Sequence, residues 1–257
     1  MSGVRRVVGI VQARMASSRL PGKMLEDIGG QPMLVRVVER ARRARTLDEI
    51  VVATTTDPDD QALVAVCEAR RYKHFRGHPT DVLDRYYQAA RMFKADIIVR
   101  LTGDCPLIDP GVIDQTVSAF LEAEPPVDFA TNRFIDDRTF PIGLDAEVCT
   151  VDALHKAWEQ ADRPHQREHV MPYLYEVEGR FRTLHVRTSP SYGSLRWTVD
   201  TAADLEFVRQ IYACFDGRDD FSWLDVLKLV EERPELGRIN AALRHRDLTD
   251  FDERWQT

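Results

Sequence analysis

A run of small residues and cations follows the first apolar segment of the chain. The segment 7–12 reads VVGIVQ, and the loop after it carries Arg14, Arg19 and Lys23 among Ala, Ser, Pro and Gly residues. Backbone N–H groups combined with Arg and Lys heads are what a polyphosphate needs for binding. The loop has neither the Walker spacing nor the glycine fingerprint of dinucleotide sites. It predicts a phosphate-binding loop, and the alternative is a polar surface loop with ordinary cations.

Two carboxylates stand where later apolar segments end. Asp104 follows the segment 96–101, and Asp200 follows the segment 195–199. Ligands of open parallel sheets bind at the carboxyl ends of the strands, and Mg²⁺ is held by one or two protein carboxylates with phosphate oxygens and water. The pair therefore predicts a magnesium site. The alternatives are that Asp104 begins a turn before a proline and that Asp200 caps a helix.

A second pair of carboxylates lies in the stretch LDAEV, residues 144–148. Alternation along a strand puts Asp145 and Glu147 on one face, where they suit recognition of hydroxyl or amine groups. They would repel a substrate carboxylate unless a cation intervenes. The candidates for that cation are Arg133, His169 and Arg196. The alternatives are that Glu147 belongs to a structural ion pair and that His169 is a structural histidine.

The elements that must position these residues alternate between strands and helices over the first half of the chain. Apolar runs predict strands at 7–12, 50–54, 74–77 and 96–101. Apolar residues at helical spacing and capping signals predict helices that start near Met33, Asp57-Pro58, Thr80 and Asp109-Pro110. This alternation implies right-handed crossovers and a mostly parallel sheet, so the fold class is α/β.

The order changes after Pro125 and Pro126. We expect strands at 128–132, 144–150, 181–188 and 195–199, and helices at 154–161 and 165–176. A further helix should start after Thr201, with Asp204 in a capping box, and the last helix should start after Ser222. The region 128–188 breaks the alternation and is the candidate sugar-binding subregion. Its apolar residues could pair two subunits across a two-fold axis; they include Phe134, Phe140, Met171 and Tyr173.

Composition limits the classes of function. The 257 residues are 44% hydrophobic and 30% charged, which is typical of a globular protein with a packed core. Net charge is −7, yet residues 1–50 hold ten Lys or Arg against five Asp or Glu, so this part carries +5 and the rest −12. Such a chain is a poor nucleic-acid binder but can bind one small polyanion. Arg36, Arg40 and Arg43, at helical spacing, are interpreted as a solvated helix face.

Compartment is inferred from apolar runs and cysteines. No apolar run is long enough to cross a membrane, and no secretory signal is visible, so we expect no membrane partner. The four cysteines are widely spaced, which favours reduced thiols in the cytoplasm over a metal or disulfide framework.

The order of the motifs resembles the acylneuraminate and KDO cytidylyltransferase superfamily, and most closely its spore-coat polysaccharide branch. The resemblance runs from Val7 to about Pro234. It is carried by VQARMASSRLPGK, FRGHPTDVLDRYYQAA, IVRLTGDCPLID, FPIGLDAEV, REHVMPYL and LRWTVDTAADLE. It departs from the KDO enzymes where their S-G-T-[DE]-R motif is replaced by TDVLDR, residues 80–85, and in its sugar-binding segments.

The resemblance implies a nucleotide-diphospho-sugar transferase fold, an α/β/α sandwich formed by one domain over residues 1–257. It implies Mg²⁺ on Asp104 and Asp200, cytosine recognition by backbone near Ala13, Arg14 and Lys23 on the phosphates, and a homodimer. The nucleotide-binding residues it suggests are Ala13, Arg14, Arg19, Lys23, Arg85 and Thr102. Those it suggests for catalysis are Lys23, Arg14 and Asp104.

The predicted function is transfer of CMP from CTP to a sugar or sugar acid, with release of pyrophosphate, for surface polysaccharide or glycoconjugate synthesis. One rival is a glycosyltransferase of the same fold, which usually needs a D-x-D metal site; here the strand ends in a single carboxylate, Asp104. The other rival is a non-catalytic nucleotide-binding protein. Retention of Arg14, Lys23, Asp104 and Asp200 argues against it.

Overall fold

A seven-stranded sheet forms the centre of the protein, seen here in a computed structural model that describes residues 5–134 and 137–243. The strands lie in the order β5-β4-β1-β6-β8-β7-β9. Their bounds are β1 Val7–Gln12, β4 Glu49–Thr55, β5 Lys73–Gly77, β6 Ile97–Thr102, β7 Phe129–Thr131, β8 Glu147–Thr150 and β9 Thr183–His185. Strands β5, β4, β1 and β6 are parallel, β8 runs antiparallel to both β6 and β7, and β9 is parallel to β7. The predicted mostly parallel α/β sheet is confirmed.

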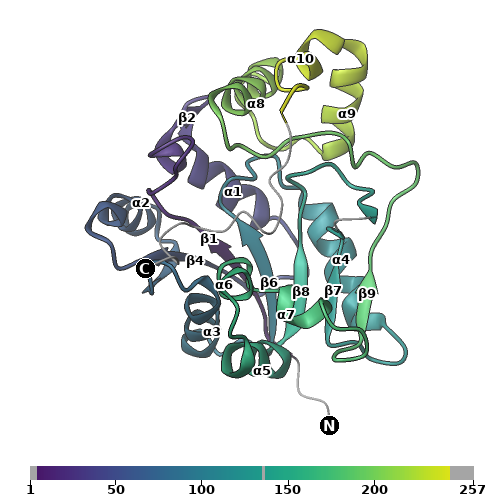
Figure 1. The fold of residues 1–257 in the computed structure, drawn as a ribbon. Helices are drawn as coiled ribbons and strands as arrows, with labels where there is room; N and C mark the ends of the chain where they lie inside the picture. The colour runs from purple at the N-terminus through teal and green to yellow at the C-terminus, as the bar shows by residue number, and fades with distance from the viewer. Residues whose placement is uncertain (1–4, 135–136, 244–257) are drawn as a thin grey trace.

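Helices cover both faces of this sheet (Figure 1). One face packs against α1 Met33–Ala41, α2 Gln61–Arg70, α4 Pro110–Glu122 and α8 Ala202–Cys214, and the other against α3 Val82–Met92, α5 Val151–Gln160 and α7 Pro172–Tyr175. Strand β1 buries side chains on both sides, because Val7 and Val11 join the first core while Val8 and Ile10 join the second. A continuous apolar run is what a strand covered on both faces requires.

Smaller elements complete the chain. They are the 3₁₀ turns η1 Lys23–Leu25 and η2 Pro58–Asp60, the short hairpin of β2 Asp27–Ile28 and β3 Gln31–Pro32, α6 Pro164–His169, α9 Trp223–Glu232 and α10 Pro234–Arg238. In Figure 1, α8, α9 and α10 group together at one end of the molecule. No helix among the described residues is long and apolar enough to cross a membrane.

Several predicted boundaries are wrong, each for a local reason. Asp81, rather than Thr80, caps α3 by accepting the Asp84 N–H at 2.9 Å. The Asp57-Pro58 signal starts the 3₁₀ turn η2, so α2 begins only at Gln61. The segment 165–176 is two short helices because Val170, at φ 71°, interrupts it.

The expected strand 195–199 is a loop. It makes one isolated bridge, between Arg196 and Ile142. The expected strand 144–150 is shorter than predicted, because β8 begins only at Glu147. The helix after Ser222 is followed by one more helix, α10. The capping boxes at Thr201 and Ser222 are confirmed.

The interpretation of the arginines on α1 is wrong for two of the three. Arg40 is 0% exposed and donates from Nε to the Ile108 carbonyl at 2.7 Å, and from Nη1 to the carbonyls of Asp219 at 2.7 Å and Phe221 at 3.1 Å. Arg36 is also buried and donates to the Ile28 carbonyl at 2.9 Å. Burial lowers the pKa of Arg40 below its usual range. These guanidinium groups tie α1 to β2 and to loops by pairing with their carbonyl groups.

The region 128–188 also differs from its interpretation. Phe140, Met171 and Tyr173, expected at a subunit interface, are buried in the cores of the subunit itself. Phe134 stacks on the His185 ring and lies against Tyr175. Phe140, Met171 and Tyr173 therefore offer no apolar surface for a partner, Phe134 is half-buried, and the homodimer stays a prediction that depends on the family resemblance.

Replacing Arg40 should destabilise the protein strongly. Arg40→Met removes three hydrogen bonds to carbonyls and leaves the buried carbonyls of Ile108 and Phe221 without this donor, so we expect a loss of about 3 kcal/mol in the free energy of unfolding, measured by urea denaturation. Arg43→Met is the matched control, because Arg43 is exposed and its ion pair with Asp219 lies at the surface; its loss should stay below about 1 kcal/mol. Equal losses for the two variants would contradict the role assigned to Arg40.

Candidate active site

The three predicted motifs meet in one cleft. Strands β1 and β6 are adjacent and in register, with Gln12 opposite Thr102, so the loops that leave them start side by side. Gly103 permits this approach, because a Cβ there would lie 2.9 Å from the Gln12 carbonyl oxygen. The lining of the cleft includes, among the residues predicted for the site, Ala13, Arg14, Arg19, Lys23, Arg85, Thr102, Asp104, Arg133, Asp145, His169 and Asp200.

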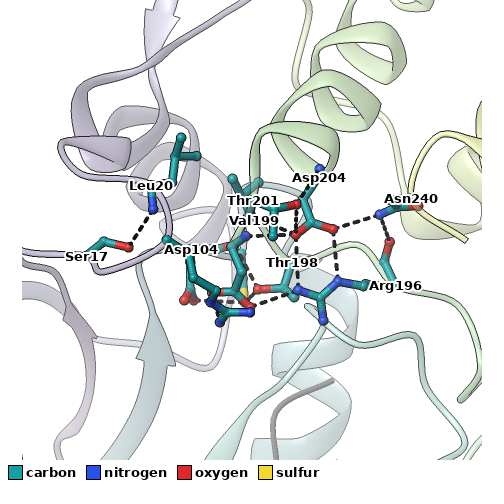
Figure 2. Close-up of polar contacts among 12 residues, drawn as sticks. Ser17, Leu20, Asp104, Arg196, Thr198, Val199, Thr201, Asp204 and Asn240 are labelled. Atoms are coloured by element: carbon teal, nitrogen blue, oxygen red, sulfur yellow. Dashed lines mark hydrogen bonds and ion pairs between the residues drawn. The ribbon is translucent and has the colours of Figure 1, made fainter. Parts of the chain in front are cut away.

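The loop after β1 is held in a defined shape. The Met15 N–H donates to Oδ1 of Asp60 at 2.6 Å, and the Leu20 N–H donates to Oγ of Ser17 at 3.3 Å (Figure 2). Gly22 has φ 75°, a left-handed conformation that suits glycine, and its N–H closes the loop on the Met15 carbonyl at 3.0 Å. The loop therefore presents Arg14 and Arg19 from a fixed backbone.

Lys23 lies at the centre of the cleft floor. It is 6% exposed, and its Nζ lies 3.1 Å from Oδ2 of Asp104, 3.1 Å from Oδ1 of Asp200 and 2.7 Å from the Val199 carbonyl oxygen. Burial alone would lower the pKa of Lys23, but the two carboxylates outweigh it and raise that pKa above its usual value. Lys23 is thus a charged ammonium at the point where three segments of the chain meet.

The two carboxylates are held in place by their contacts. Burial would raise the pKa of Asp104, but Lys23 and the Thr102 hydroxyl hold it below the usual range. Its backbone is fixed as well, because the Val199 N–H donates to the Asp104 carbonyl at 2.8 Å. Asp200 also pairs with Arg19 at 3.0 Å. The structure thus brings Asp104 and Asp200 together although 95 positions separate them in the sequence.

These two residues fit a magnesium ion in their chemistry. Both are hard oxygen donors, both contact the Lys23 ammonium, and both line the cleft beside the loop after β1. Mg²⁺ is usually bound through one or two carboxylates while substrate phosphates and water fill its other positions. The part of the chain that the structure describes holds no cluster of three His, Cys, Asp or Glu residues for an all-protein metal site.

Arginines and carboxylates form a network beside the two strands β6 and β8. Glu147 is buried, forms an ion pair with Arg100 and lies 3.6 Å from Nη1 of Arg133. Asp145 lies 3.6 Å from Nε of Arg133 and forms a bidentate pair with Arg138. Glu147 is therefore a buried ion-pair member, which was the alternative reading, while Asp145, Arg133 and Arg100 line the cleft.

Sequence reasoning missed Arg100 and Arg138. Arg100 stands inside the apolar strand β6, and a charge in a buried strand demands a partner. Its register opposite Glu147 on β8 supplies one, so the signal was present once β6 and β8 were paired. Arg138 lies in an irregular segment and gave no such signal.

Of three other predicted residues, Arg196 does not line the cleft, while His169 and Arg85 do. Arg196 is buried and donates to Asp200 and Asp204, so it lies behind the cleft rather than among its lining residues. His169 lines the cleft from the end of α6. Arg85 also lines it, donates to the carbonyls of His78 and Pro79, and has its pKa lowered to about 10 by burial.

Comparison with known proteins agrees with this geometry. The family profile for cytidylyltransferases matches residues 8–213. The spore coat polysaccharide biosynthesis protein SpsF of Bacillus subtilis is 30% identical over 89% of this chain and 95% of that protein.

Two solved structures share the fold. A cytidylyltransferase from Leptospira borgpetersenii aligns with a TM-score of 0.87 and 33% identity over 94% of this chain and 100% of that one. A CMP-2-keto-3-deoxy-manno-octonic acid synthetase in complex with CTP aligns with a TM-score of 0.62 and 25% identity over 82% of this chain and 99% of that one. With a fold, a cleft and a family profile that agree, the chain belongs to the cytidylyltransferase family and is a CTP-dependent nucleotidyltransferase.

Proposed function

We propose that the protein transfers CMP from CTP to a sugar or sugar acid, releases pyrophosphate and serves the synthesis of surface polysaccharide or glycoconjugate. The observation that carries the proposal is the buried Lys23 ammonium between Asp104 and Asp200, at the foot of the loop that bears Arg14 and Arg19. The polysaccharide role is supported by the similarity to SpsF.

In the nucleotide half, the loop after β1 holds the triphosphate. Arg14 and Arg19 bind phosphate oxygens with their planar forks, and Lys23 contributes a compact charge. Backbone near Ala13, with Thr102 and Arg85 on the same wall of the cleft, contacts the nucleoside. Binding of CTP draws Arg19 from its ion pair with Asp200 onto a phosphate of higher charge.

Magnesium would be held by Asp104 and Asp200. When bound, the ion neutralises charge on the phosphate oxygens and on the departing pyrophosphate. Lys23 and the Thr102 hydroxyl hold the pKa of Asp104 below its usual range, so this carboxylate needs no base to prepare it for a cation.

The chemistry is an in-line displacement at phosphorus. An acceptor oxygen forms a bond to the α-phosphorus of CTP while the bond from that phosphorus to the bridging oxygen breaks, and pyrophosphate leaves. In a keto-sugar acid the attacking oxygen is that of the anomeric hydroxyl, whose proton passes to solvent water as the new bond forms. In a sugar phosphate the attacking oxygen is an ionised phosphate oxygen, which carries no proton. The protein contributes position and electrostatic stabilisation, with Lys23 and Arg14 facing the charge that develops.

The acceptor is recognised on the opposite wall. Asp145 and His169 can bond sugar hydroxyls, and Arg133 can receive a carboxylate because its guanidinium is a cation among the lining residues of the cleft. We place the reaction in the cytoplasm, in keeping with four cysteines that are all free thiols.

Nucleotide preference tests the cytidylyl assignment. A ligand that binds only the folded state raises its stability by mass action, so CTP with Mg²⁺ should raise the melting temperature more than ATP, GTP or UTP at equal concentration. Thermal shift assays measure this directly. Equal shifts for all four nucleotides would contradict the assignment.

The proposed metal ligands are tested by removing one charge at a time. Asp104→Asn and Asp200→Asn should each lower kcat by at least about 10²-fold at saturating Mg²⁺, because each loses a ligand oxygen of full charge. Asp225→Asn, at the exposed start of α9, is the matched control and should keep the kcat of the parent enzyme. Pyrophosphate release measures all three, and circular dichroism confirms their folding. A near-parental rate in either site variant removes that residue from the metal site.

Lys23→Ala separates chemistry from binding. If the ammonium stabilises charge that grows at the α-phosphate, kcat should fall by about 10²- to 10³-fold with little change in KM for CTP. Lys73→Ala, which removes an exposed lysine on β5, is the control. A rise in KM at constant kcat would show that Lys23 only anchors the ground state.

A further inference from the structure

The carboxylate of Asp200 is held from behind by a chain of buried polar groups. Nη2 of Arg196 donates to Oδ2 of Asp200 at 2.9 Å, opposite the oxygen that contacts Lys23 and Arg19. The same guanidinium donates from Nε to Oδ1 of Asp204 at 2.9 Å and from Nη2 to its Oδ2 at 3.1 Å. One planar fork thus fixes Asp200 relative to the start of α8. Figure 2 shows Arg196 and Asn240 meeting at Asp204.

Asn240 closes this chain from the far end of the sequence. Its side chain is 5% exposed, and its Nδ2 donates to Oδ1 of Asp204 at 3.0 Å and to the carbonyl oxygen of Arg196 at 2.9 Å. The Asn240 amide therefore bonds both to the backbone of Arg196 and to the Asp204 carboxylate, which orients the Arg196 guanidinium. Asn240 follows α10 and lies outside the residues 8–213 that the family profile matches.

Helix capping alone does not explain the arrangement. Asp204 closes a capping box with Thr201, and Asp225 closes the same kind of box with Ser222 at the start of α9. The described residues give Asp225 no partner beyond Ser222 within hydrogen-bond distance, and that box is exposed. Asp204 is 0% exposed and accepts from Arg196 and Asn240 in addition. The donors Arg196 and Asn240 are therefore not needed for capping of α8.

We propose that Asn240 is a positioning residue of the active site, which acts through Asp204 and Arg196 to fix the Asp200 carboxylate for the metal ion of CTP. The inference rests on the proposed metal role of Asp200. Groups that orient a metal ligand without touching the metal are typically worth about 10- to 100-fold in metal affinity or activity. The C-terminal segment with α9 and α10 is thereby part of the catalytic unit.

Metal binding measured without turnover tests the proposal. The enzyme is titrated with Mn²⁺ in the presence of saturating CTP and no acceptor, and free Mn²⁺ is followed by electron paramagnetic resonance. Asn240→Ala should weaken Mn²⁺ binding by about 10-fold, while the melting temperature stays above that of the assay. Asn240→Asp, which keeps the shape but replaces the donor with a second carboxylate beside Asp204, should weaken it at least as much.

Leu236→Val is the matched control. Leu236 is buried in α10 and contributes no polar group, so this variant loosens the packing of the same segment without touching the chain of hydrogen bonds. It should lower the melting temperature and leave Mn²⁺ affinity within about twofold of the parent. In steady-state assays the Asn240 variants should raise the apparent KM for Mg²⁺ by the same factor as they weaken Mn²⁺ binding.

The outcomes distinguish the positioning role of Asn240 from the metal role of Asp200. Parental Mn²⁺ affinity in folded Asn240→Ala and Asn240→Asp, or equal weakening by Leu236→Val, overturns the positioning role and leaves the proposed function intact. Failure of the parent enzyme itself to bind Mn²⁺ with CTP overturns the metal role of Asp200 and this inference with it. If Asn240→Ala does not fold, the isosteric Asn240→Asp decides by the same criterion.

Discussion

The Lys23 ammonium is the contact on which the arrangement of the site depends. It joins the loop after β1, the turn after β6 and the loop before α8, three segments that the chain reaches far apart in sequence. A buried lysine is costly unless its charge is paired and its protons are bonded. Here the three N–H donors of the Lys23 ammonium have three acceptors, two of which are carboxylates. The cost of burying the ammonium is therefore offset only when the three segments are in place. Formation of the cleft and pairing of Lys23 are therefore the same event.

Charge within the cluster is balanced. Lys23, Arg19 and Arg196 face Asp104, Asp200 and Asp204, three cations against three anions in direct contact. A balanced cluster can exist without ligand and still rearrange, because Arg19 is the most exposed of the three cations and is free to turn to a phosphate. Arg196 is buried and fixed on both its carboxylates. Arg19, the exposed cation, can therefore bind the ligand, whereas Arg196, the buried one, holds the carboxylates in place.

Much of the fold and of the nucleotide half of the site could be predicted from the sequence. Parallel strands place their carboxyl ends at one edge, so the apolar runs before Lys23 and Asp104 were enough to bring the two together. The loop at 195–199 was harder, because it makes backbone hydrogen bonds to Ile142 and Asp104 without a continuous ladder, and its sequence looks like that of a strand. The burial of Arg36 and Arg40 could not be predicted either, since helical spacing shows that residues share a face but not what covers it.

The same limit explains why the acceptor half and the C-terminal segment were the least predictable. Arg133, Arg138 and Asp145 act through contacts between irregular segments, and no periodicity describes those. Asn240 is a lone amide after a short helix, and its meaning appears only when α8 and α10 pack so that it reaches Asp204. Short motifs identify the residues that touch a ligand because ligand chemistry restricts them to few types. Residues that hold those groups in place are restricted by packing instead, which allows many solutions. A sequence thus shows the reaction of an enzyme more readily than the support that makes the reaction efficient.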